Sequence, residues 1–172
     1  MLRKIFVFCT VIIGYLLQCT VFHRISLGGI VPNILIIITS SFGFMRGKKE
    51  GLMIGFFAGF LIDVFYGDIL GFYALIYMVI GYLNGFFKQL FYPEDIKLPL
   101  ILISGSELLY CFSAYVFLFL LRSKFNFSFY FVHVILPEIV YTVLVTLVFY
   151  KLILWINEKL EIREKRSASK FV

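Results

Sequence analysis

Six long apolar runs, separated by short charged segments, limit what this chain can fold into. They cover residues 5–22, 30–45, 52–66, 69–87, 98–121 and 129–155. A helix needs roughly 20 residues to cross about 30 Å of hydrocarbon, so the first, fourth, fifth and sixth runs are long enough. The second and third are short, and would need tilt or local thinning of the bilayer. The pattern predicts an all-α membrane protein with six transmembrane helices.

The composition excludes the soluble classes of protein. Of 172 residues, 62% are apolar and 15% charged, whereas soluble domains are about 45–50% apolar and about 25% charged. We expect one transmembrane domain over residues 1–156 and a basic cytoplasmic tail over 157–172. The three cysteines, Cys9, Cys19 and Cys111, are odd in number and form no CxxC pair, which indicates neither a disulfide framework nor a metal site.

The positive charges set the expected orientation. The net charge of +6 arises from 16 Lys and Arg residues that lie mainly between the apolar runs, which favours a role in orientation over nucleic-acid binding. With both termini in the cytoplasm, 13 of them lie inside, and only Arg24, Arg122 and Lys124 lie outside. This positive-inside bias predicts a multi-pass membrane protein with its N- and C-termini in the cytoplasm and the lipid bilayer as its solvent.

Small residues recur at helical spacing in the third and fourth runs. Such residues let membrane helices approach closely, so we expect these two runs to form a tight antiparallel hairpin. A path for a substrate between the glycines is the alternative, and packing is the favoured interpretation. The packing residues are Gly51, Gly55, Gly59, Gly71, Ala74, Gly81 and Gly85.

Three carboxyl groups, those of Asp63, Glu107 and Glu138, fall within apolar runs. Ionisable groups in a membrane are costly, usually face the bundle interior and often mark function. In the expected orientation, Asp63 and Glu138 lie toward the outer half with Asn33, so these three residues are candidates for a polar pocket that opens outward. The alternative is that each carboxyl is protonated and hydrogen-bonded to nearby hydroxyls. The role of Glu107, nearer the middle of the bilayer, stays open.

Sequence signatures of catalysis are missing. The chain contains no HExxH, GxSxG, phosphate-loop or dinucleotide-binding motif. Its two histidines, His23 and His133, have no metal-ligand spacing. We therefore expect no enzymatic activity, no cofactor and no metal.

Several segments together resemble the rod shape-determining protein MreD family. They are PNIL at 32–35, RGKKEG at 46–51, GFFAGFLID at 55–63 and LGFYAL at 70–75. The proline-bearing segment LPEIVY at 136–141 is similar too, although Thr142 stands where many members carry Asn. The match is clear over residues 32–85 and rests mainly on hydropathy elsewhere.

The resemblance implies a non-enzymatic component of the cell-elongation machinery, placed as a multi-pass protein in the bacterial cytoplasmic membrane. Such a protein would bind MreC and help to couple MreB filaments to peptidoglycan synthesis by a RodA-type glycosyltransferase and a penicillin-binding transpeptidase. The family fold is also similar to that of substrate-binding subunits of energy-coupling-factor transporters. A vitamin-binding transporter subunit is therefore the alternative. Those subunits carry small residues for docking in the first span, where this chain has Gly14 without a small partner four residues away.

Overall fold

The computed structural model describes residues 2–26, 29–67, 69–92, 96–117 and 127–168, and its architecture is all-helical. The elements in chain order are α1 (Leu2–Leu17) with the π-helical turn η1 (Gln18–Phe22), α2 (Ile34–Arg46), α3 (Lys48–Tyr66), α4 (Phe72–Asn84) with the 3₁₀ turn η2 (Gly85–Leu90), α5 (Lys97–Tyr115), and α6 (Phe127–Tyr130) followed by the π-helical turn η4 (Phe131–Ile135) and α7 (Leu136–Ala168). A π-helical turn follows α1, a 3₁₀ turn follows α4, and a π-helical turn precedes α7.

Each apolar run contains a helix, which confirms the predicted all-α class. Among the described residues, three segments are long and apolar enough to cross a membrane: Ile5–Phe22, Lys97–Tyr115 and Phe131–Ile162. The helix Ile34–Arg46 is apolar but shorter. Six transmembrane helices therefore remain a prediction, as does the likeness to transporter subunits.

Helix α2 forms the centre of the bundle. Every residue from Ile34 to Met45 is buried, and α1, α3, α4, α5 and α7 all pack against this helix. A helix that is apolar on all sides is stable only when neighbours surround it. It begins later than the apolar run because the Asn33 side chain accepts a hydrogen bond from the backbone N–H of Ile36, at 3.2 Å, and caps the helix.

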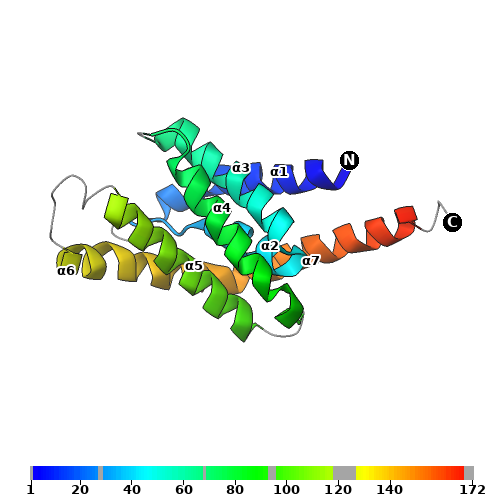
Figure 1. Cartoon of the computed structure of the whole chain (residues 1–172). Coiled ribbons are helices and arrows are strands. Elements are labelled where there is room, and N and C mark those ends of the chain that lie inside the picture. Colours follow the sequence, from blue (N-terminus) through cyan, green and yellow to red (C-terminus); the bar gives the residue numbers. More distant parts are fainter. Residues whose placement is uncertain (1, 27–28, 68, 93–95, 118–126, 169–172) are drawn as a thin grey trace.

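Helices α3 and α4 form an antiparallel hairpin whose backbones touch (Figure 1). A Cβ atom added at Gly55 would overlap the carbonyl oxygen of Tyr77, and one added at Gly59 would overlap that of Tyr73. Gly51 and Gly81 face each other in the same way. Glycine is required along this contact because any side chain would separate the two helices.

The other predicted packing residues divide into two groups. The Cα atom of Ala74 lies against Gly59, and Gly85 lies against the backbone of Lys48, so both belong to the contact. Gly71 differs: a Cβ there would meet nothing within 4 Å, and its φ of 95° is left-handed. The reason for glycine at position 71 is therefore the turn into α4.

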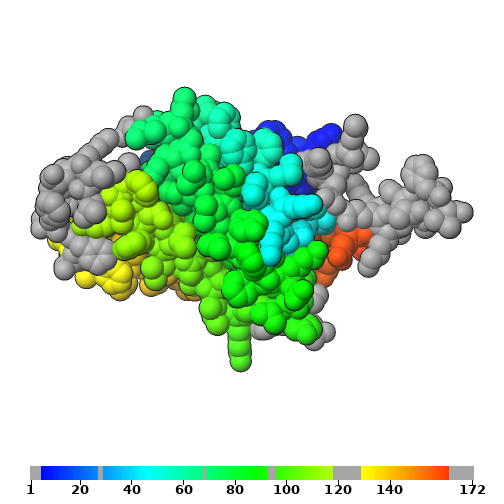
Figure 2. All heavy atoms as spheres, in the orientation of Figure 1, coloured from blue at the N-terminus to red at the C-terminus, as the bar shows by residue number. Residues whose placement is uncertain are grey.

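The bundle has apolar side chains on its surface and polar groups inside. Large hydrophobic residues such as Leu70, Ile101 and Val148 are about 70% exposed, at 73%, 69% and 71%. Figure 2 shows the face of the molecule that α3, α4 and α5 mainly form. Among the described residues, buried polar groups occur on every major helix from α2 to α7. An extensive apolar surface around a polar interior is typical of a protein solvated by lipid.

The described ends of the chain lie toward the same end of the molecule (Figure 1). Helix α7 continues past the predicted domain limit at residue 156 without a break. Asn157 and Leu160 are both buried, so the first turn of the predicted tail packs on the bundle.

Replacing Gly55 by leucine tests the contact between α3 and α4. We expect Gly55→Leu to lower the stability of the purified protein by about 3 kcal/mol, because the side chain overlaps a backbone carbonyl that cannot move aside. Thermal unfolding in detergent measures the effect. Gly105→Leu is the matched control, since Gly105 on α5 has open space around it. Equal melting temperatures for the two variants would contradict the close approach.

Candidate functional site

Asp63 binds the start of the neighbouring helix. Its Oδ1 accepts a hydrogen bond from the backbone N–H of Tyr73 at 2.9 Å. Its Oδ2 accepts from the N–H groups of Gly71 at 3.1 Å and Ala74 at 2.9 Å. The first N–H groups of a helix have no partner within the helix, and a carboxyl group suits them both as acceptor and as negative charge. The Asp63 side chain, only 2% exposed, thus fixes the turn between α3 and α4.

Asn33 joins three helices where α2 begins. Its Oδ1, besides capping α2, accepts a hydrogen bond from the Tyr77 hydroxyl of α4 at 2.8 Å. Its backbone N–H donates to Oγ1 of Thr142 on α7 at 3.1 Å. Thr142 itself is fully buried. The Thr142 hydroxyl therefore takes part in holding α7 against α2.

Glu107, Cys111 and Glu138 form a cluster between α5 and α7. One potential ligand atom from each residue lies within 4.8 Å of the other two. The Cys111 thiol lies 4.0 Å from Oε1 of Glu107 and 3.7 Å from Oε2 of Glu138. The cluster therefore joins two helices, since Glu107 and Cys111 lie on α5 and Glu138 lies on α7.

The helix that carries Glu138 has an irregular start. Pro137 lacks an N–H and its ring crowds the carbonyl four residues earlier in a regular helix. The π-helical turn η4 ends at Ile135, directly before α7 begins. Such wide turns accommodate the loss of a regular helical hydrogen bond and are frequent at functional sites. Glu138 follows in the first turn of α7 and faces α5.

The structure therefore divides the predicted pocket residues among three sets of partners. Glu138 groups with Glu107, whose role was open, and Asn33 bonds to Tyr77 and Thr142. No hydrogen bond within the described ranges links Asp63 to Asn33 or Glu138. Cys111 was not predicted as part of the site. Its position four residues after Glu107, on one helix face, was the available signal.

A second buried polar bridge starts from Asn84 on α4. The Asn84 amide donates to Oγ of Ser106 at 2.7 Å and to Oγ of Ser40 at 3.4 Å, which joins α4 to α5 and α2. Hydrogen bonds between membrane helices contribute roughly 1 kcal/mol each. Sequence reasoning missed this bridge because small polar residues within an apolar run do not reveal their partners.

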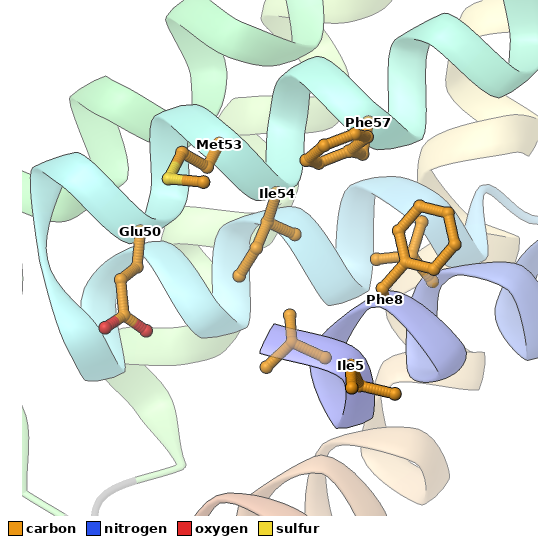
Figure 3. A pocket seen from close by; sticks show the side chains of 8 residues that line it. Ile5, Phe8, Glu50, Met53, Ile54 and Phe57 are labelled. Carbon is orange, nitrogen blue, oxygen red and sulfur yellow. The ribbon is translucent and has the colours of Figure 1, made fainter. Parts of the chain in front are cut away.

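The charged end of α2 contacts both α7 and the first turn of α3. Arg46 Nε donates to Oδ1 of Asn157 at 2.6 Å and lies 4.0 Å from Oε2 of Glu50. Glu50 also borders an apolar groove of about 330 Å³ between α1 and α3, with Phe8 and Phe57 toward its other end (Figure 3). The groove is lined by Ile5, Val7, Phe8, Val11, Glu50, Met53, Ile54 and Phe57.

These features define an all-helical membrane protein with a polar interior. A comparison with protein-family models matches residues 1–156 to the rod shape-determining protein MreD family. The chain therefore belongs to the MreD family, which confirms the resemblance read from its motifs and extends it over the whole predicted transmembrane domain. Comparisons with curated proteins and with solved structures give no match.

Removing the Asp63 carboxyl tests its part in the hairpin. We expect Asp63→Ala to destabilise the protein by about 3 kcal/mol, since three backbone N–H groups lose their acceptor. Asp63→Asn keeps one acceptor oxygen and should lie between this variant and the wild type. Thermal unfolding of the three proteins in one detergent measures the order. If Asp63→Ala has the same melting temperature as the wild type, the Asp63 carboxyl does not hold the turn between α3 and α4.

Proposed function

We propose that this protein is a non-enzymatic scaffold of the cell-elongation machinery that binds MreC through its helix surfaces. Through MreC it helps to couple MreB filaments to the RodA-type glycosyltransferase and the penicillin-binding transpeptidase that build peptidoglycan. Membership of the MreD family carries the proposal, because that family determines rod shape.

The use of the interior polar groups supports a scaffold. Asp63 directs both carboxyl oxygens at the backbone of α4, and Asn33 is bonded to α4 and α7. Groups that hold helices together in this way are not available to recognise a substrate. The apolar outer faces remain, and the single span of a partner would pack on such a face.

The environment of Gly14 also supports the scaffold over a vitamin-binding transporter subunit. A Cβ atom at Gly14 would overlap the side chain of Ile38 on α2. The small residue of α1 is thus used for packing inside the bundle, and does not present a docking surface to a transporter scaffold protein.

The proposed placement is a multi-pass protein of the cytoplasmic membrane with six spans and both termini in the cytoplasm. The ends of the described chain lie toward one end of the molecule (Figure 1), as an even number of spans requires. The basic segment 157–172 then faces the anionic inner leaflet, which attracts Lys and Arg.

Cysteine labelling tests this orientation. Lys49 and Arg24 are both exposed and lie on opposite sides of the membrane in the proposed topology. In intact cells, a membrane-impermeant maleimide should label Arg24→Cys. The labelling of Lys49→Cys should not exceed the background labelling of the wild-type chain, which has three free cysteines. Labelling of Lys49→Cys before lysis would reverse the orientation.

Depletion and partner capture test the function. Loss of the protein should turn rod-shaped cells into spheres, and affinity-tagged protein should capture MreC from solubilised membranes. Asp63→Ala should reduce MreC capture more than Glu107→Ala, because Asp63 fixes two helices relative to one another. Normal rods after depletion, with tight binding of a vitamin to the purified protein, would contradict the scaffold and favour the transporter alternative.

A further inference from the structure

We propose that Glu107, Cys111 and Glu138 form a binding site for a divalent metal ion of the zinc type. The site combines a thiol and two carboxyls, the ligand set that suits a borderline metal such as Zn²⁺ better than Mg²⁺ or Ca²⁺, which prefer oxygen alone. The proposal concerns a site within the bundle and stands apart from the binding of MreC.

The distances fit a tetrahedral ion. Zinc binds thiolate sulfur at about 2.3 Å and carboxylate oxygen at about 2.0 Å, which places a sulfur and an oxygen ligand about 3.5 Å apart. The Cys111 sulfur lies 3.7 Å from Glu138 and 4.0 Å from Glu107. Both sulfur–oxygen distances are therefore within about half an ångström of the tetrahedral value, and the three ligand atoms all lie within 4.8 Å of one another.

An unused ligand atom points to an occupant. The Glu107 side chain is 0% exposed, and its Oε2 has no hydrogen-bond partner. The two oxygens of a carboxyl belong to one rigid group, so Oε2 lies beside the Oε1 that faces Cys111. A buried polar atom without a partner costs about 1–3 kcal/mol, and coordination to a metal would remove this cost.

Charge balance favours a cation. Among the described residues, no Lys or Arg forms an ion pair with Glu107 or Glu138. On binding, Zn²⁺ would displace the Cys111 thiol proton and any carboxyl protons, and its two positive charges would offset two of the three negative charges on the thiolate and the two carboxylates. Glu138 is half-buried, which leaves a route for the ion and for a water molecule in the fourth position.

The site would tie two helices together at an irregular point. Glu107 and Cys111 lie one turn apart on α5, and Glu138 lies on α7 just after η4 and Pro137. A ligand that binds the folded state alone stabilises it. Metal occupancy would therefore fix α7 against α5 and raise the thermal stability of the bundle.

Cobalt is the direct probe, because Co²⁺ bound to a thiolate has a sulfur-to-metal absorption band in the near ultraviolet. The metal-free protein in detergent micelles should develop this band on titration with Co²⁺, lose it on addition of Zn²⁺, and melt at a higher temperature with Zn²⁺. Cys111→Ser should abolish the band, and Glu138→Gln should weaken Co²⁺ binding at least about tenfold. Cys19→Ser, which changes a cysteine on η1, should behave as the wild type.

Two results would overturn the proposal. One is a wild-type protein that shows neither a band nor a Zn²⁺-dependent rise in melting temperature. The other is a band that persists in Cys111→Ser and disappears in Cys19→Ser, which would place the metal elsewhere. The first of these results is measured on the wild-type protein alone, so a variant that fails to fold does not affect it. Neither result depends on whether the protein captures MreC.

Discussion

The close approach of α3 and α4 is the contact on which the rest of the bundle depends. Glycines at 51, 55, 59 and 81 bring two backbones together, and the Asp63 carboxyl locks their relative position by accepting three N–H groups from the start of α4. In lipid no hydrophobic force drives helices together, so packing and hydrogen bonds must do so. The resulting hairpin provides a rigid wall against which α2 is buried.

Around that wall, polar groups inside the bundle connect helices that are distant in sequence. Asn33 joins α2 to α4 and α7, Asn84 joins α4 to α2 and α5, and Arg46 joins α2 to α7. These connections leave the outer surface apolar, as a protein solvated by lipid requires. The Glu107–Cys111–Glu138 cluster differs from these connections, because it brings two carboxyl groups and a thiol together between α5 and α7.

The sequence predicts the parts of this structure that depend on local spacing. Apolar runs locate the helices, and the four-residue recurrence of glycine identifies the hairpin contact. The partners of polar side chains could not be predicted, because they depend on how the helices rotate about their axes. Asp63 thus entered the predicted pocket although its partners are backbone groups eight to eleven residues later. Cys111 was overlooked because its neighbour Glu138 is 27 residues away.

Hydrogen–deuterium exchange tests most directly whether the Asp63-locked hairpin is the rigid core of the bundle. The backbone amides of Gly71, Tyr73 and Ala74 should exchange slowly in the wild type reconstituted in lipid nanodiscs, since each is bonded to Asp63. The same amides should exchange much faster in Asp63→Ala, while those of α2 change less. Rapid exchange of these three amides in the wild type would contradict the account.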